Sequence, residues 1–404
     1  MSKGLQRTAR AVAMGLAIAT LAVACGSATA NPVPPSTGPT TAPTPGSSAV
    51  AIASPTPSPT PSPTPTPTAT PIPTPTPEPT PELVPAPLTG RLVSPAAARR
   101  HPIAVMIDDL SAARPQSGFS AASIVWQAPA EGGIPRYMMI FGETRPEAVG
   151  PVRSSRYYYI AWAAEWKAVY AHAGGSPQAL ATLRAQGNGQ LVYNADEFAW
   201  GPYFHRVTTK FPPHNLYTDG KQLDRIAKRV GASDRPPKPI WRFAPDALPA
   251  ERPIGGRIEV SYSTSTIRYS YDRLTNSYPR TVSVEGPQRD ETTKQRIAPK
   301  NVVIMLMRFG ALNDGHPQKH RLEAQVVGSG VAWISTNGRT IKGTWRKASL
   351  TGPTKFYDRR GREVTLTVGQ TFINVMPTGT IVKVRAGAPP PISPRFGDHA
   401  MMPS

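Results

Sequence analysis

The chain has 404 residues, of which 49 are proline and one is cysteine, and its formal net charge is +20. This length allows two or three domains. One cysteine excludes a disulfide framework within the chain and any zinc or iron–sulfur site built from several cysteines.

Residues 1–24 have the pattern of a signal peptide. Basic side chains at Lys3, Arg7 and Arg10 precede an uncharged, apolar run over residues 11–24. As a helix this run covers only about 21 Å, which is too short to span a bilayer comfortably. Small residues directly before Cys25, with Gly26 after it, resemble a bacterial lipobox. The pattern predicts that Cys25 is lipidated, with palmitate among its acyl chains, and becomes the mature N-terminus. The alternative is a plain secretory signal with a leftover free cysteine.

Residues 25–91 are rich in Pro, Thr and Ser, and Thr/Ser-Pro repeats run from residue 54 to residue 81. Such a composition cannot bury enough apolar surface to offset the entropy of ordering. Alternating proline favours polyproline II, which extends about 3.1 Å per residue. We therefore expect a disordered, extended stalk that holds the folded part away from the membrane, on its extracytoplasmic face.

Residues 92–241 are predicted to form an α/β or α+β domain with a mixed sheet, because strand and helix patterns alternate. The expected strands are 103–107, 124–127, 137–141 and 168–171, and the expected helices are 157–166, 177–186 and 219–230. Residues 242–253 contain several prolines and are expected to be a linker.

Residues 254–385 are predicted to form a β-rich domain with hairpins. Short alternating runs include 258–262, 267–271, 302–306, 322–327, 331–334, 340–345, 364–366 and 371–375. Residues 386–404 are expected to be a flexible tail. Residues 251–404 hold 23 Lys+Arg and 11 Asp+Glu, so this part is strongly basic. Outside a cell, such a surface meets anionic envelope polymers sooner than nucleic acid, although excess charge is also a general aid to solubility.

Polar and glycine-rich stretches follow several predicted strands of the first domain, where open α/β sheets bind their ligands. The candidate ligand-binding residues in these stretches are Arg114, Glu131, Arg136, Arg153, Arg156, His172, Gly174, Gly175, Ser176, His214 and Asn215. We expect Arg114, Glu131, Arg153, Arg156, His172 and His214 to converge in one pocket.

The order of these stretches resembles the YerB-type lipoprotein family of bacteria, a two-domain family of uncharacterised function. Further pieces of the resemblance are Tyr269-Ser270-Tyr271-Asp272, the strand from Asn301 to Met305, and Val368-Gly369-Gln370-Thr371-Phe372 before Met376-Pro377. The resemblance covers residues 101–377. It implies an exported protein that is tethered to the membrane, and it supplies no catalytic residues.

Ser176 and Pro177 are favourable at the N-cap and first position of a helix. Gly174 and Gly175 before them permit close approach of a ligand to backbone N–H groups, so the turn is a candidate anion site. Ser176 is alternatively a cap only, or a nucleophile activated by His172 or His214.

Arg153 and Arg156 lie three residues apart, and their planar guanidinium groups suit carboxylate or phosphate. Either arginine could instead pair with Glu131 or Asp108 inside the domain. Glu131 could be a general acid or base, or an ion-pair partner. The adjacent carboxylates of Asp108 and Asp109 are weak evidence for a metal, so no metal and no cofactor is expected. The loop with Asp314, His316 and His320 is expected to be solvated.

Three functional hypotheses remain. The leading one is a membrane-tethered module that binds an anionic envelope ligand, either a peptidoglycan carboxylate or a phosphate-bearing polymer. The second is an envelope hydrolase or transferase that uses Glu131, His172 and His214, although no complete catalytic constellation is visible. The third is a scaffold that docks a partner protein. A lipid anchor at Cys25 would attach the protein to the membrane in each case.

Overall fold

The computed structural model describes residues 82–235 and 237–390. The predicted signal peptide, Cys25, the Thr/Ser-Pro repeats and most of the C-terminal tail lie outside these residues. Within the described part, no helix is both long and apolar enough to cross a membrane.

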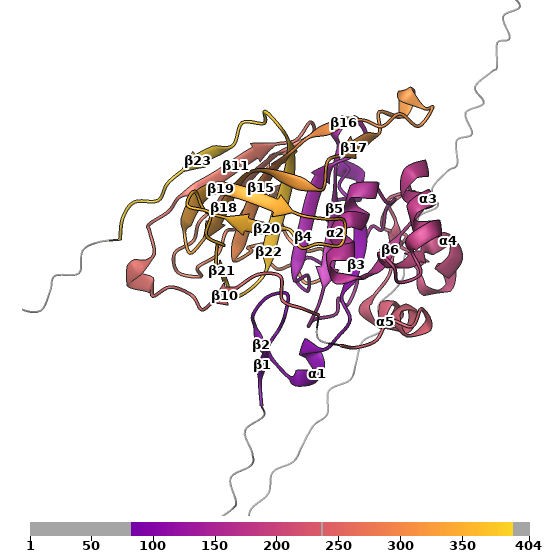
Figure 1. Ribbon diagram of the computed structural model, residues 1–404, viewed down its shortest axis with the longest axis horizontal. Coiled ribbons are helices and arrows are strands. Elements are labelled where there is room, and N and C mark those ends of the chain that lie inside the picture. Colours follow the sequence, from indigo (N-terminus) through magenta and orange to yellow (C-terminus); the bar gives the residue numbers. More distant parts are fainter. Residues whose placement is uncertain (1–81, 236, 391–404) are drawn as a thin grey trace, which may run out of the picture. The chain divides into compact units, whose positions relative to one another are not determined.

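A ten-stranded mixed sheet forms the centre of the fold (Figure 1). Its strand order is β20 (Lys355–Tyr357), β19 (Arg339–Lys347), β18 (Gly328–Thr336), β15 (Asn301–Met307), β22 (Thr371–Pro377), β4 (Ile124–Pro129), β5 (Pro135–Phe141), β3 (Ile103–Asp108), β6 (Val169–His172) and β7 (Tyr193–Asp196). Strands β3, β4, β5 and β6 confirm the strands that were predicted in the first domain.

The sheet runs without interruption across the predicted domain boundary. Strand β22 from the β-rich region pairs in parallel with β4 from the helix-containing region, with Phe372 opposite Val125. Nearly all residues of both strands are buried, and on each face of the sheet the apolar core extends through both regions. The predicted fold class is confirmed: a mixed sheet with helices is followed by a β-rich part, and the two parts share one sheet.

One face of the large sheet is covered by α2 (Tyr157–Ala163) and α3 (Pro177–Gln186). Helix α3 begins as the sequence predicts, because Ser176 Oγ accepts the Ala179 N–H at 3.3 Å and Pro177 takes the first position. On α2, Tyr159 and Trp162 are buried against the sheet, and Trp162 stacks on Trp126 of β4 with ring centroids 4.5 Å apart.

The opposite face is covered by α5 (Gly220–Arg229) and by a second, five-stranded sheet. Helix α5 is capped by Asp219 and buries Leu223, Ile226 and Ala227, which share one side at helical spacing. The second sheet has the order β14 (Gly286–Pro287), β13 (Arg280–Val282), β12 (Thr266–Ser270), β11 (Arg257–Ser261) and β23 (Lys383–Arg385).

Short elements complete the fold. They are β1 (Val84–Pro85), β2 (Leu92–Val93), α1 (Pro95–Ala98), α4 (Glu197–Trp200), β8 (His205–Arg206), β9 (Leu216–Tyr217), β10 (Phe243–Ala244), β16 (Phe309–Ala311), β17 (Leu322–Ala324) and β21 (Leu366–Thr367). Residues 82–91, which were assigned to the stalk, instead join the folded part, because β1 pairs with β2 and Leu88 is buried in the core.

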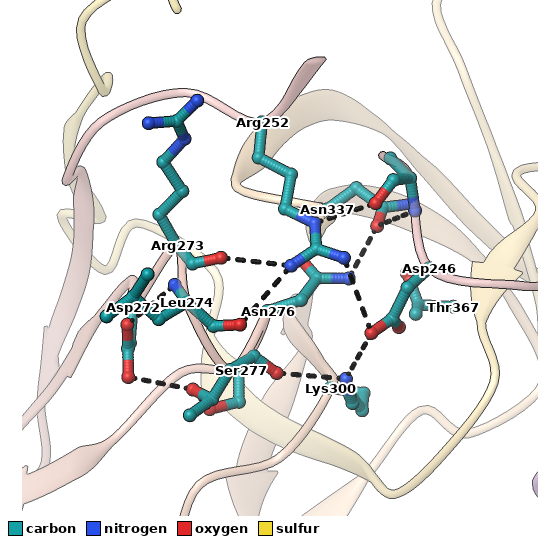
Figure 2. A network of polar contacts seen from close by, with 12 residues as sticks. Asp246, Arg252, Asp272, Arg273, Leu274, Asn276, Ser277, Lys300, Asn337 and Thr367 are labelled. Atoms are coloured by element: carbon teal, nitrogen blue, oxygen red, sulfur yellow. Dashed lines mark hydrogen bonds and ion pairs between the residues drawn. The ribbon is translucent and has the colours of Figure 1, made fainter. Parts of the chain in front are cut away.

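The segment predicted as a linker is held in place by a polar network (Figure 2). Arg252 donates from Nε to the Ala247 carbonyl at 2.7 Å and from Nη1 to the Arg273 carbonyl at 3.0 Å. Lys300 Nζ lies 2.7 Å from Asp246 Oδ2. In addition, β10 within this segment pairs in parallel with β21. Residues 242–253 are therefore attached to the β-rich region along much of their length.

Candidate functional site

The polar residues singled out in the sequence lie mainly at one edge of the large sheet. Strands β3, β6 and β7 run parallel to one another and end there in Asp108, His172 and Asp196. Strand β5 is antiparallel to β3, so its second residue, Arg136, lies opposite Asp108. The carboxyl ends of parallel strands form the edge at which open α/β sheets bind ligands.

One carboxylate oxygen of Asp108 contacts two positively polarised groups. Its Oδ2 lies 2.7 Å from His214 Nδ1 and 3.1 Å from Arg153 Nε. The Asp108 side chain is almost completely buried, whereas those of His214 and Arg153 are 14% and 24% exposed. Contact with a carboxylate requires Nδ1 of His214 to carry a proton. Asp108 therefore orients one histidine and one arginine that reach the surface.

A second ion cluster lies at the start of β5. Glu131 Oε2 accepts from Arg136 Nη2 at 3.0 Å, and Glu131 Oε1 pairs with Arg156 Nη2. The guanidinium group of Arg136 also donates to the Ser154 carbonyl at 2.7 Å, and that of Arg156 donates to the Ser155 carbonyl. Arg156 and Arg153 thus each pair with a carboxylate inside the domain, which was the alternative to direct ligand binding.

The cluster carries more positive than negative charge. Three guanidinium groups, those of Arg136, Arg153 and Arg156, are set against the carboxylates of Asp108 and Glu131. Burial lowers the pKa of Arg136, and Asp108 opposes this effect. Burial also lowers the pKa of Arg153, with Asp108 opposing and Arg136 adding to it. A further anion at this edge would lower the electrostatic energy of the cluster.

His172 is inside the protein and does not line the edge. Its ring is fully buried, Nδ1 lies 2.8 Å from the Gly174 carbonyl, and Nε2 lies 2.8 Å from Asn194 Oδ1. Both ring nitrogens are therefore engaged, and the ring holds the Gly174 turn against β7. Of the three acid–base candidates, only His214 and Glu131 reach the surface.

The backbone donors of the Gly174–Ser176 turn are largely satisfied within the protein. Gly174 N–H donates to Asp196 Oδ1 at 3.0 Å, and Ser176 N–H donates to the Ser155 carbonyl at 3.2 Å. Ser176 is itself buried and caps α3. The N–H groups of Gly174 and Ser176 are therefore not available to an anion, in contrast to what the glycine-rich turn suggested. The glycines allow close packing, because a Cβ atom at Gly174 would lie 3.3 Å from Phe198 and one at Gly175 would lie 3.2–3.3 Å from Leu180 and Ser155.

Arg114 does not join the other candidates, so the expected convergence of six residues fails at this position. Arg114 pairs with Asp109, with Nη2 to Oδ1 at 2.9 Å, in a polar core that includes Gln127 and the fully buried Arg280. Successive residues of a strand point to opposite faces. Asp108 therefore faces the Arg153 side, while Asp109 and its partner Arg114 face the five-stranded sheet.

Asn215 acts on the position of His214. Its Oδ1 accepts from Arg206 Nη1 at 3.0 Å, and its Nδ2 donates to the Val207 carbonyl at 3.2 Å. These bonds close the base of the loop between β8 and β9. The loop thereby places the His214 side chain next to Asp108.

The sequence predicted a solvated loop at Asp314–His320 but not the contact that the hairpin β16–β17 makes beside Glu131. A cavity of about 490 Å³ lies between its loop, which includes His316, His320 and Arg321, and Gly132–Gly133 beside Glu131. The Gly132 N–H donates to the His320 carbonyl at 3.1 Å, so the loop is held against the helix-containing region. Burial is the main cause that lowers the pKa of Arg156. Tyr158 opposes this effect, and the positive charge of Arg321 lowers the pKa further. Local sequence carries no signal for this contact, because the two segments are far apart in the chain.

A larger cavity of about 740 Å³ lies elsewhere, among Pro85, Trp241, Phe243, Asp246 and Lys300. Its walls are mainly apolar, and none of the candidate residues lines it. Among the described residues, no group of three or more His, Cys, Asp or Glu side chains is placed to hold a metal ion.

Comparisons with known proteins support the resemblance seen in the sequence. Residues 88–233 match the model described as "Protein of unknown function (DUF3048) N-terminal domain", and residues 258–373 match the corresponding C-terminal domain. The chain is 30% identical over 298 residues to "Putative lipoprotein YerB" of Bacillus subtilis (strain 168), which covers 72% of this chain and 86% of that protein. The crystal structure of the YerB protein from Bacillus subtilis has a TM-score of 0.65 and 25% identity, over 74% of this chain and 99% of that chain. The YerB-type features of the sequence pointed to a family without an assigned function. Matches to both domains, together with this identity over most of the chain, show that the chain belongs to this family, the DUF3048 family.

Proposed function

We propose that this protein is a lipid-anchored module on the extracytoplasmic face of the membrane that binds an anionic polymer of the cell envelope. The signal pattern before Cys25 supports the anchor, as does the name of the Bacillus subtilis relative, "Putative lipoprotein YerB". The net charge of +20 and the excess of guanidinium groups at the sheet edge support an anionic ligand.

The contacts and the partial exposure of Arg153 are the main support for the binding proposal. Its Nε forms an ion pair with Asp108 at 3.1 Å but no hydrogen bond, its side chain is partly exposed, and among the described residues its guanidinium group donates no hydrogen bond to the protein. Asp108 holds the group in place, so little side-chain entropy is lost when a ligand binds. A carboxylate or phosphate can take two parallel hydrogen bonds from this end of the guanidinium group. His214 beside it offers one further donor when protonated.

The test is ligand binding by the full mature chain, kept soluble by Cys25→Ala. Inorganic phosphate and a soluble cell-wall fragment should raise the melting temperature, because they bind the native state. Arg153→Ala should weaken binding roughly 10- to 150-fold, the equivalent of losing one charge-assisted contact of about 1.5–3 kcal/mol. Arg184→Ala, on the exposed side of α3, removes the same charge and should leave binding unchanged. Equal affinities of the two variants would reject the proposal and favour the scaffold hypothesis.

The anchor is tested separately in the bacterium. Radiolabelled palmitate should enter the parent protein, and Cys25→Ala should abolish the label and release the protein from the membrane. A signal peptide cleaved at another site, with an unmodified Cys25, would exclude lipidation.

A second function, hydrolysis or group transfer on an envelope polymer, is favoured by the Asp108–His214 pair. A carboxylate that fixes Nδ1–H leaves Nε2 of the imidazole available as a general base. The protein should then release product from a wall polymer, and His214→Gln should abolish release while binding persists. Binding without product release would leave the binding function alone.

A further inference from the structure

Two phenylalanine rings are exposed beside the candidate site. Phe198 on α4 is 81% exposed, and Phe211 in the β8–β9 loop is 88% exposed. Large exposed apolar side chains often mark a binding surface when they lie next to one another or to a functional group. Both of these rings are attached through short chains of contacts to the residues of the sheet edge.

Phe198 is fixed to the end of β6. Asp196 Oδ1 accepts the N–H of both Gly174 and Phe198, at 3.0 and 3.4 Å. The ring lies over Gly174, where a Cβ atom would come within 3.3 Å of Phe198 Cε2. The Gly174 carbonyl in turn accepts the Ser155 N–H, two residues from Arg153.

Phe211 is connected to the same edge through His214. The preceding residue, Lys210, donates to Glu291 Oε1 at 2.5 Å and to the Tyr217 hydroxyl at 2.9 Å. The Phe211 carbonyl accepts the N–H of His214, whose side chain is bound to Asp108. The loop is therefore held before and after Phe211, and the exposure of this ring is a property of the ordered loop.

Charged and hydrogen-bonding residues lie close to both rings in the chain. Glu197 and Asp196 adjoin Phe198, while Lys210 and His214 adjoin Phe211. The centre of a protein–protein interface is normally depleted of charged residues, so this mixture suits a protein partner poorly. A sugar ring, in contrast, offers a face of C–H groups that stacks on an aromatic ring and an edge of hydroxyl groups that bonds to polar neighbours.

From this arrangement we propose that the ligand of the edge is an anionic polysaccharide, whose sugar rings stack on Phe198 and Phe211 while its carboxylate binds Arg153 and His214. This inference rests on the proposed function and narrows it, because a polymer of glycerol and phosphate has no ring to stack. Among the anionic envelope polymers, the inference selects a polysaccharide, and it assigns Phe198 and Phe211 as contact residues.

The experiment compares three probes on the soluble full chain by calorimetry. The probes are a disaccharide–peptide fragment of peptidoglycan, poly(glycerol phosphate) and inorganic phosphate. Phe198→Leu and Phe211→Leu keep an apolar side chain but remove the ring, and Phe198→Tyr and Phe211→Tyr keep the ring. Leu274→Ala, at a position that is 91% exposed, is the control for loss of an exposed apolar group elsewhere.

The leucine variants should each bind the peptidoglycan fragment about three- to tenfold more weakly, and the tyrosine variants should bind it like the parent. Binding of inorganic phosphate should be unchanged in all four. Added salt should weaken the contribution of Arg153 and leave that of the two rings unaffected.

The outcomes separate the inference from the function beneath it. If the leucine variants bind the fragment like the parent while Arg153→Ala does not, the polysaccharide assignment is wrong and the anionic site stands. A parent that binds poly(glycerol phosphate) but not the fragment also overturns the assignment. If Arg153→Ala binds all probes like the parent, both the assignment and the proposed function fail.

Discussion

Glu165 and Lys347 form an ion pair in which Oε1 and Nζ are 2.8 Å apart and neither side chain has any exposed surface. Glu165 follows α2, and Lys347 ends β19 in the β-rich region. Thr354 also donates to Glu165, from its hydroxyl at 2.5 Å and from its N–H at 3.1 Å. The pair therefore connects the two sequence regions at a point that water does not reach.

Lys347→Met should destabilise the protein by about 3–5 kcal/mol, because it leaves the Glu165 carboxylate buried without its cation. Urea unfolding measures this change in the free energy of unfolding. The double variant Glu165→Leu/Lys347→Met should recover most of the loss, since it removes both buried charges. Equal stability of Lys347→Met and the parent would show that the pair is not buried in solution.

Arg156→Ala should cost more stability than Arg153→Ala. The Arg156 side chain is only 5% exposed, and its loss leaves Glu131 with Arg136 alone. Arg153 is more exposed, and Asp108 keeps His214 after its removal. We expect about 2–3 kcal/mol for Arg156→Ala and about 1 kcal/mol or less for Arg153→Ala. Thermal unfolding without ligand measures both, and the reverse order would contradict the pairing described above.

Gly174→Ala should destabilise the protein by about 1–2 kcal/mol, because Gly174 has a φ of +63° in the left-handed region. The added methyl group also meets Phe198 at 3.3 Å and should shift its ring. Unfolding gives the first effect, and affinity for the peptidoglycan fragment gives the second. Gly361→Ala is the control: Gly361 has a φ of +76°, but a Cβ atom there meets nothing within 4 Å. Gly361→Ala should therefore lose similar stability without any change in affinity for the fragment.

Asp246→Asn should lower stability in a pH-dependent manner. Burial opposes ionisation of Asp246, but hydrogen bonds from Lys300 and Asn276 and the nearby Arg252 outweigh it, so the pKa of Asp246 lies below 3.8. A carboxylate with a lowered pKa stabilises the folded state above its unfolded pKa, and the contribution is lost as the pH falls through the folded pKa.

The difference in unfolding free energy between the parent and Asp246→Asn should therefore be present near neutral pH, and it should be lost progressively as the pH falls below 3.8 and through the lower pKa of the folded state. Its size should be about 1 kcal/mol or less, since the side chain is 35% exposed. Acid titration of the two melting temperatures measures it. A difference that persists unchanged at low pH would mean that the amide disturbs the network in Figure 2 for reasons other than charge.

Elements whose local sequence patterns are strong lie where the sequence predicts them. The predicted helix 177–186 has the bounds of α3, because its cap and first residue are both encoded locally. The strand predicted at 302–306 is β15, whose apolar run is buried on both faces. Strand β7 was missed, since Tyr-Asn-Ala-Asp has little apolar character and becomes a strand by pairing with β6.

For the candidate site, too, some features follow from the local sequence and others from the tertiary structure. The sequence by itself located the polar residues at strand ends and helix starts, because strand length, caps and glycines are local properties. It also determined the cationic character of the chain, and its pattern before Cys25 predicts a lipoprotein signal. The order of strands in the sheet decided which residues meet, since pairing between distant segments depends on packing energy that no local pattern contains. Tertiary structure thereby set Arg153 beside Asp108, turned Arg114 to the opposite face, enclosed His172, and joined both sequence regions in one sheet through β4 and β22.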